Sequence, residues 1–290
     1  MTTSTAASRS ALAALLFSVA ITAGAFYASP ARATSQRPGK NPPHANNVVI
    51  IIMENRDYDP IIGSSAAPYV NRTLVPQSAL MTDSHAVAHP SQPNYLALFS
   101  GSTQGIVNDS CPHTLGTDNL GAELIAAGKT FDGYSESMPI DGYGGCGTGE
   151  YARKHNPWVN FTNVPSTSNL IYSGFPHSAP DVAIVIPNLC NDMHDCSTRT
   201  GDAWLKKNVP PILKYNRAHN GLLILTWDEA EPDRNGSNRI ATLLVGPTVV
   251  PGSYNQHINH YSVLRTIETI EGIPCIAYAC QASFVENIWR

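Results

Sequence analysis

Short apolar runs alternate along this chain with stretches of helical character, and this alternation constrains the fold most. Val48 to Met53, Asp181 to Ile186 and Leu222 to Trp227 are almost entirely apolar, which is typical of strands buried on both faces. Further strands are expected at Thr130 to Tyr134 and Ala241 to Val245. Strands separated by helices predict an α/β fold with a mostly parallel central sheet and helices on both faces.

Helices are predicted from caps, prolines and apolar spacing. The predicted helices are Pro68 to Val75, Tyr95 to Ser100, Asn119 to Ala127, Gly201 to Tyr215 and Tyr261 to Ile270. Asn119 is expected as an N-cap, and Gly128 as the stop that follows the same helix. The helix from Gly201 is expected to break or end near Pro210-Pro211, because an interior proline removes a backbone donor and clashes with the preceding turn. No internal repeat and no linker follows residue 46, so residues 47–290 are interpreted as one domain.

The N-terminus has the pattern of an export signal. Arg9 precedes an apolar run of small residues from Ala11 to Ala25, and Ala31-Arg32-Ala33 fits the cleavage pattern of signal peptidases. Residues 1–33 are therefore predicted to be a signal peptide, and the protein to be secreted or extracytoplasmic. An uncleaved anchor is the alternative, although the run is short for a bilayer. Residues 34–46 are polar and rich in proline, and a disordered leader is expected there.

Six cysteines lie beyond the predicted signal peptide. An even number in an exported chain predicts disulfides. The pairs Cys190–Cys196 and Cys275–Cys280 are close in sequence, which would leave Cys111 for Cys146; this pairing is a preference among several. A zinc site made of cysteines is disfavoured, because no Cys-x-x-Cys pair occurs.

Charge limits the classes of partner. Charged residues make up 14% of the chain, the net charge is −4, and no basic stripe appears. Nucleic acid is therefore not expected as a partner. No segment beyond the N-terminal run is long and apolar enough for stable membrane insertion. The sequence does not indicate an oligomeric state.

Carboxylates and an amide follow two of the predicted buried strands directly. Glu54 and Asn55 come after the first strand, and Asp228 and Glu229 come after the strand that ends at Trp227. The carboxyl ends of parallel strands are where open α/β sheets bind ligands. Oxygen donors suit Mg, Ca or Mn, and sites that also contain histidine suit Zn or Fe. One divalent metal ion is therefore expected, with its identity open.

Ser91 is the candidate nucleophile. It stands between two prolines, just before a predicted helix, in His89-Pro90-Ser91-Gln92-Pro93-Asn94-Tyr95. Free N–H groups at a helix N-terminus suit an anionic phosphoryl group. A metal ion beside the hydroxyl would activate the serine for attack, with Ser91 as a further ligand. The alternative is that Ser91 only caps the helix.

Three histidines are candidate acids or bases. His194 lies in a loop with Asp192 and Asp195, directly after the Asp181 to Ile186 strand, and a Cys190–Cys196 disulfide would brace this loop. His155 and His260 are the other two candidates, because a positioned histidine can protonate a leaving oxygen. Asp192 is a further candidate ligand. A surface loop with incidental charge, and purely structural histidines, are the alternatives.

Taken together, these segments resemble the bacterial phosphoesterase family. That family contains secreted acid phosphatases and phospholipases C and belongs to the wider alkaline phosphatase superfamily. The matching segments are Val48 to Arg56, His89 to Tyr95, Lys154 to Pro157, Asn191 to Asp195, Thr226 to Glu229 and His260 to Glu268. Each segment is short, but their joint presence in this order is specific, and the resemblance runs from about Asn47 to Glu271. It implies an alkaline-phosphatase-like fold.

The resemblance also implies roles for particular residues. Ser91 matches the nucleophile, the pairs Glu54–Asn55 and Asp228–Glu229 match metal ligands, and the active-site histidines match His155, His194 and His260. In related nucleotide pyrophosphatases the nucleophile lies in Thr-x-Pro-Asn, and Ser91 to Asn94 has that shape, which makes Asn94 a candidate for substrate binding. Asn108 is a second candidate, because Gln104 to Asn108 is similar to a stretch whose asparagine binds a phosphoryl oxygen. The superfamily's usual Asp-His pair is absent at Asp228-Glu229, which favours one metal over two.

The implied activity is hydrolysis of small phosphate esters in two steps. Ser91 attacks phosphorus, a histidine protonates the leaving alcohol, and water hydrolyses the phosphoserine. An acid phosphatase acting on phosphomonoesters is favoured over a phospholipase C or other phosphodiesterase, because the family's phospholipases C typically carry additional C-terminal domains. The non-enzymatic alternative is an exported binding protein with a decayed site, which the joint presence of Glu54, Ser91 and Asp228 disfavours.

Overall fold

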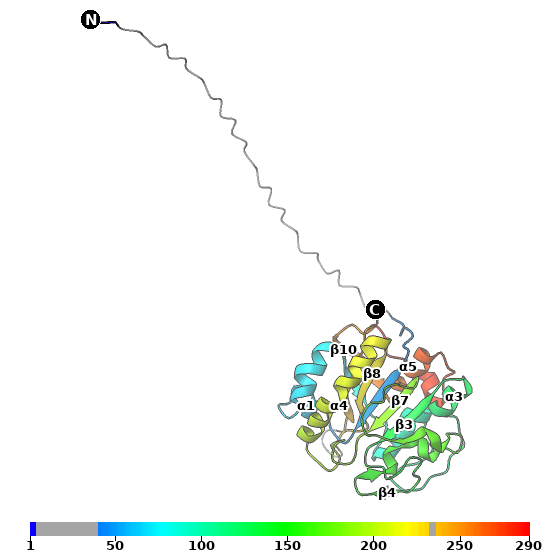
Figure 1. Cartoon of the computed structure of the whole chain (residues 1–290). Helices are drawn as coiled ribbons and strands as arrows, with labels where there is room; N and C mark the ends of the chain where they lie inside the picture. Colours follow the sequence, from blue (N-terminus) through cyan, green and yellow to red (C-terminus); the bar gives the residue numbers. More distant parts are fainter. Residues whose placement is uncertain (4–39, 232–235) are drawn as a thin grey trace. The chain divides into compact units, whose positions relative to one another are not determined.

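The fold is taken from a computed structural model of the chain, which describes residues 1–3, 40–231 and 236–290 (Figure 1). The predicted signal peptide, residues 1–33, lies almost wholly outside the described residues. The end of the predicted leader does lie within them. There Ala45 is buried, and the Asn46 amide donates to the Asn220 carbonyl at 3.1 Å. Chain that packs on the domain therefore begins before residue 47.

The central sheet has eight strands in the order β10-β2-β9-β8-β1-β7-β3-β6. The strands are β1 Val48–Met53, β2 Ala79–His85, β3 Phe131–Ser135, β6 Asn169–Ile171, β7 Val182–Ile186, β8 Leu222–Trp227, β9 Arg239–Val245 and β10 Gly252–Asn259. Only β9 runs antiparallel to its neighbours β2 and β8 within this sheet, and the other pairs are parallel. The predicted mostly parallel sheet is confirmed. A separate two-stranded sheet pairs β4 Gly147–Thr148 with β5 Tyr151–Ala152.

Helices cover both faces of the large sheet, as predicted (Figure 1). They are α1 Tyr58–Ile61, α2 Ser91–Ser100, α3 Leu120–Ala126, α4 Thr198–His219 and α5 His260–Glu271. Alternate residues of β1 divide the core into two layers. Val48, Ile50 and Ile52 pack in one cluster with residues of α2, α3 and α5. Val49, Ile51 and Met53 pack in the other cluster with residues of α1 and α4. Burial of β1 on both faces explains its unbroken apolar run.

Short helical turns complete the described chain. They are a π-helical turn at Val70–Leu74 and 3-10 turns at Val75–Gln77, Arg153–His155, Pro157–Asn160, Ser166–Ser168 and Ala277–Gln281. The predicted disulfides Cys111–Cys146, Cys190–Cys196 and Cys275–Cys280 are all confirmed. None of the helices in the described part of the chain has both the length and the apolar character needed to cross a bilayer.

The predicted break near Pro210-Pro211 is wrong. The helix α4 continues through both prolines and is 22 residues long. Val209, Ile212 and Leu213 flank the prolines and are buried in the core layer beneath α4. Burial of this apolar face offsets the hydrogen bonds that the prolines cannot donate.

Candidate active site

The two polar pairs predicted at strand ends do lie side by side. The strands β1 and β8 are parallel neighbours, with Met53 opposite Trp227 in register. The residues that follow are therefore also adjacent: the Asp228 amide donates to the Met53 carbonyl at 2.9 Å, and the Asn55 amide donates to Asp228 Oδ1 at 3.1 Å. Asn55 has a φ of 47°, a left-handed conformation that asparagine tolerates. The sharp turn after β1 thus keeps Glu54 and Asn55 beside Asp228.

Ser91 lies in this same cluster. It is the first residue of α2, reached from β2 through residues 86–90. Its hydroxyl is buried and lies 3.0 Å from Glu54 Oε2 and 3.2 Å from Glu229 Oε1. The structure therefore brings the candidate nucleophile within hydrogen-bond distance of both carboxylate-bearing strand ends.

Asn94 holds the loop that precedes Ser91. Its Oδ1 accepts from the amides of Val87 and Ala88, both at 3.0 Å. Its Nδ2 donates to the carbonyls of Ala88 and Pro90. These bonds use the side chain of Asn94 to fix the approach to α2. The geometry gives Asn94 a role in positioning Ser91, and its predicted contact with substrate stays a prediction.

Asn108 is exposed, and its side-chain oxygen accepts from the Ser110 amide at 3.0 Å. The next residue, Asp109, faces the cluster instead. Asp109 Oδ1 accepts from the Gln92 amide at 2.9 Å, and Asp109 Oδ2 pairs with Lys154 Nζ at 2.9 Å. The loop after α2 thus brings the Asp109 carboxylate to the N-terminus of that helix, where Lys154 from the turn Arg153–His155 pairs with it.

His155 is buried against the carboxylates. Its Nε2 lies 3.1 Å from Glu54 Oε1 but has no hydrogen-bond partner, and its Nδ1 lies 3.4 Å from Asp192 Oδ2. The ring stacks on Tyr95, with centroids 5.1 Å apart. Burial, followed by the nearby charge of Lys154, holds the pKa of His155 well below its ordinary value. The imidazole is therefore neutral, which is the form that binds a metal.

The loop between Cys190 and Cys196 contributes two more groups. Asp192 Oδ1 accepts from the His194 amide at 2.7 Å, while Asp192 Oδ2 has no partner. His194 Nδ1 lies 2.7 Å from Asp195 Oδ1, and its Nε2 lies 3.3 Å from Lys154 Nζ. His194 is thus oriented by a carboxylate on one side and faces the lysine with its other nitrogen.

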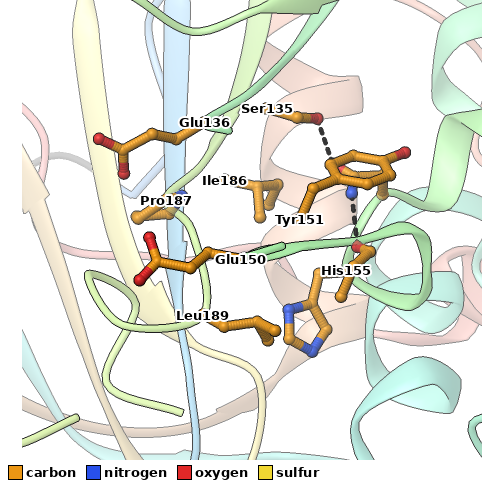
Figure 2. Close-up of a pocket in the computed structure, with 10 residues that line it drawn as sticks. Ser135, Glu136, Glu150, Tyr151, His155, Ile186, Pro187 and Leu189 are labelled. Carbon is orange, nitrogen blue, oxygen red and sulfur yellow. Dashed lines mark hydrogen bonds between the residues drawn. The ribbon is translucent and has the colours of Figure 1, made fainter. Parts of the chain in front are cut away.

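A small polar pocket behind His155 shows how this loop is held (Figure 2). The carboxylates of Glu136 and Glu150 lie at the side of the pocket away from His155. They accept from the Asn188 amide at 3.1 Å and from Asn188 Nδ2 at 2.6 Å, respectively. Glu136 also accepts from Asn191 Nδ2 at 2.9 Å. Together with the disulfide, these bonds fix the start of the loop that carries Asp192 and His194.

His260 lies behind Asp228. It is the first residue of α5, is buried, and its Nε2 lies 2.6 Å from the Asp228 backbone carbonyl. Burial lowers the pKa of His260 to about 4. A neutral ring bonded to a backbone carbonyl suits a support for the turn after β8, so the geometry favours a positioning role for His260.

Burial raises the pKa of the four carboxylates nearest Ser91 and His155, those of Glu54, Asp192, Asp228 and Glu229. Desolvation is the largest cause for Glu54 and Asp228, whose pKa values lie well above the ordinary range, with neighbouring carboxylates adding to it. The pKa of Asp192 and that of Glu229 are each raised to about 7, chiefly by burial. For Lys154, burial works to lower the pKa, but the ion pair with Asp109 and the other carboxylates outweigh it and raise the pKa. The cluster is therefore short of positive charge.

Unpaired lone pairs point to the same conclusion. Four buried side-chain atoms near Ser91 lack a hydrogen-bond partner: Asn55 Oδ1, Asp192 Oδ2, Asp228 Oδ2 and His155 Nε2. Buried polar atoms in native proteins are almost always satisfied, and a cation satisfies lone pairs. In addition, ligand atoms of Glu54, His155 and His194 lie within 4.8 Å of one another. The residues fit a metal ion.

Four residues of the cluster were not among the site residues predicted from the sequence, although three of them lie in the segments that carry the family resemblance. The Tyr95 hydroxyl donates to Glu54 Oε1, and His89 Nδ1 pairs with Glu229 Oε2. The other two are Asp109 and Lys154. Tyr95 had a usable signal, because it follows Ser91 by four residues and so shares its helix face. The positions of the other three depend on loops that carry no periodic pattern.

The sequence is similar to those of known phosphatases. A model of the phosphoesterase family matches residues 64–274. The chain is 45% identical over 249 residues to a phosphatidylinositol-3-phosphatase of Mycobacterium tuberculosis, covering 84% of this chain and 82% of that protein. It is 30% identical over 270 residues to an acid phosphatase of Aspergillus fumigatus, covering 84% of this chain but only 59% of the fungal enzyme.

Solved structures agree on the fold. A protein of the alkaline phosphatase superfamily from Vibrio parahaemolyticus superposes with a TM-score of 0.61 at 13% identity, covering 86% of this chain and 72% of that one. The periplasmic domain of EptC from Escherichia coli, solved in complex with zinc, gives a TM-score of 0.54 at 11% identity, covering 82% and 87%. At these identities the likeness concerns the fold alone.

Proposed function

The chain belongs to the phosphoesterase family, and from this premise we propose that it is a secreted, metal-dependent acid phosphatase that hydrolyses phosphomonoesters through a phosphoserine. That it is a hydrolase of phosphoester bonds follows from the family. The finer proposal depends on one observation: the Ser91 hydroxyl lies 3.0 Å from Glu54 and 3.2 Å from Glu229 at the N-terminus of α2, among buried lone pairs that lack partners.

Glu54, Asn55, Asp228 and Glu229, with Ser91 itself, would hold one divalent ion. Asp192, His155 and His194 border the same space and are further ligand candidates. Such an ion supplies positive charge that lowers the pKa of a serine hydroxyl and neutralises phosphoryl oxygens. Mg, Ca, Mn, Zn and Fe remain the candidates, because the donor set contains both oxygen and imidazole nitrogen.

The protein's own groups provide the remaining chemistry. The Ser91 hydroxyl loses its proton to Glu54 or Glu229, whose oxygens it already contacts. The N-terminus of α2 and Lys154 offer positive charge to the phosphoryl oxygens. His194, held by Asp195, enters the first step with both ring nitrogens protonated, donates the Nε2 proton to the leaving alcohol, and then takes a proton from the water that hydrolyses the phosphoserine.

Export is proposed from the predicted signal peptide together with the three disulfides, which are typical of oxidising compartments. Asn94 and Asn108 remain the candidates for substrate binding, and Asn94 also fixes the loop that precedes Ser91. The phosphodiesterase and the decayed binding protein remain the alternatives.

A panel of substrates tests the proposal. The purified protein is assayed with p-nitrophenyl phosphate, bis-p-nitrophenyl phosphate, phosphatidylcholine and short-chain phosphatidylinositol 3-phosphate. The last is included because of the name of the mycobacterial relative. A phosphomonoesterase hydrolyses the first and last substrates and leaves the two diesters intact. Preference for the diesters would favour a phospholipase C, and inactivity on all four would favour a binding protein.

A further inference from the structure

A second group of metal-ligating side chains lies at the edge of the large sheet. It consists of Asp83 and His85 on β2 and His257 on the edge strand β10. Asp83 and His85 are two residues apart, so they project from the same face of β2. His257 stands directly opposite Asp83 in the parallel register, next to an irregularity between Tyr254 and His257. We name these three residues the edge cluster.

The distances within the edge cluster suit a shared ion. His85 Nε2 lies 2.8 Å from Asp83 Oδ1, and His257 Nδ1 lies 3.1 Å from Asp83 Oδ2. One ligand atom from each residue lies within 4.8 Å of the other two. Ligand atoms that bind one zinc ion at about 2.0–2.2 Å are separated from one another by distances similar to those in the edge cluster. The side chains are 41%, 21% and 69% exposed for Asp83, His85 and His257, so an ion has access from solvent.

The tautomer of His85 makes a cation necessary. Its Nδ1 lies 2.6 Å from the Ser237 carbonyl, which only accepts, so Nδ1 carries the hydrogen. In the neutral ring Nε2 then presents a lone pair to a carboxylate oxygen of Asp83. Two lone pairs at 2.8 Å need a positive species between or beside them: either a second proton on the ring or a metal ion. A metal-binding histidine that donates its other N–H to a backbone carbonyl is the usual outer-shell arrangement.

The edge cluster is separate from the site around Ser91. Among the described residues, the hydrogen bonds and ion pairs of its three side chains are made within the cluster and to Ser237. None of them involves Glu54, Asp228 or Glu229.

We propose that Asp83, His85 and His257 form a second metal site, which takes a zinc-class divalent ion with two imidazoles and one carboxylate as protein ligands. Two nitrogens and one oxygen favour Zn, Ni or Cu over Mg or Ca. The ion ties the edge strand β10 to β2, and β2 leads through residues 86–90 directly to Ser91. Three protein ligands leave a position for water.

The test counts zinc at two independent sites. Full-length protein is stripped with a chelator, equilibrated with Zn²⁺ near neutral pH, and analysed by titration calorimetry and by metal content after gel filtration. Asp228→Asn serves as the background, because it weakens the site around Ser91. The substitution His257→Ala or Asp83→Asn is then added to the Asp228→Asn protein. The matched control is His177→Ala, which removes an exposed histidine outside the cluster.

The Asp228→Asn protein is expected to keep one zinc equivalent, and both cluster variants to bind that equivalent at least about tenfold more weakly. The His177→Ala control keeps it. Zinc should also raise the melting temperature of Asp228→Asn but not that of its His257→Ala derivative. Unchanged zinc affinity in both cluster variants would overturn the proposal. If the site around Ser91 binds no metal ion, the result is different. The unsubstituted protein then binds one zinc equivalent, and the single substitution His257→Ala removes it.

Discussion

Single atoms at the end of β1 and β8 explain why this site needs a cation. Glu54 sits fully buried, and Asn55 Oδ1 and Asp228 Oδ2 are left without hydrogen-bond partners. A fold that buries several carboxylates beside one serine would be destabilised by their mutual repulsion unless positive charge enters. Burial and the neighbouring carboxylates, which raise the pKa values of Glu54 and Asp228, also favour the binding of a metal ion at this site.

Replacement of Ser91 tests the nucleophile. Ser91→Ala removes the attacking oxygen but leaves α2 and the carboxylates in place. We expect kcat on p-nitrophenyl phosphate to fall by about 10³-fold or more, with an unchanged thermal melt by circular dichroism. Ser110→Ala, an exposed serine of the neighbouring loop, is the control and should keep full activity. Near-normal turnover by Ser91→Ala would show that another group attacks phosphorus.

Replacement of His194 tests the general acid. His194→Ala should slow hydrolysis of an alkyl phosphate by about 10²-fold or more, because its leaving alkoxide needs a proton. Hydrolysis of p-nitrophenyl phosphate should fall much less, because nitrophenolate leaves unprotonated. Asp195→Asn should show the same pattern more weakly. An equal loss on both substrates, with loss of bound metal, would instead identify His194 as a ligand.

At the scale of elements, the sequence was informative where strands are buried on both faces. Val48 to Met53 and Leu222 to Trp227 were predicted with the observed bounds, and with them the place of the four strand-end ligand candidates. The strand β10 was not predicted, because an edge strand such as Gly252–Asn259 carries mostly polar, exposed residues without an apolar run. The positions of Lys154 and Asp109 were beyond prediction, since loop paths depend on tertiary contacts.

The helix α5 carries a titratable group that should make stability depend on pH. Glu268 is fully buried, accepts from the Ile276 amide at 2.9 Å, and has its pKa raised to about 7, chiefly by burial. Unfolded, it ionises near its ordinary value of 4.5. The unfolded state therefore loses this proton first, and the contribution of Glu268 to stability falls as pH rises from about 4.5 to about 7.

Glu268→Gln should remove this dependence while keeping an oxygen for Ile276. The difference in free energy of unfolding between Glu268→Gln and the unsubstituted protein should therefore change by about 1–3 kcal/mol from about pH 5 to about pH 8, in favour of the variant. Urea unfolding at both pH values measures it. Asp118→Asn, at an exposed carboxylate, should show no such trend. A difference between Glu268→Gln and unsubstituted protein that does not change with pH would contradict the assigned protonation.

At the scale of the whole molecule, the sheet acts as a frame that brings distant segments together. Residues 54, 91, 192 and 228 meet because β1, β2, β7 and β8 deliver their carboxyl ends, or the loops that follow them, to one edge of the sheet. The family resemblance anticipated this meeting. The bracing of the Asp192 loop by the Cys190–Cys196 disulfide was predicted and is confirmed, whereas the contacts from Glu136 and Glu150 emerged only from the structure.

Removal of the metal should inactivate the enzyme without unfolding it, because the described strands form their core without metal-ligand contacts. Exhaustive chelation should abolish hydrolysis of p-nitrophenyl phosphate, and one divalent ion from a tested series should restore it. Asp228→Asn should raise the concentration of ion needed for half-maximal activity by about tenfold or more. Full activity after chelation, verified by metal analysis, would exclude a metal-dependent mechanism.

The central claim is that Ser91 becomes phosphorylated at a site that requires a metal ion. Rapid acid quenching during turnover, followed by peptide mapping with mass spectrometry, measures this directly. Phosphate should appear on Ser91 in metal-loaded protein, and should be absent after chelation and from Ser91→Ala. Phosphate on another residue, or phosphorylation of Ser91 that persists without metal, would contradict the account.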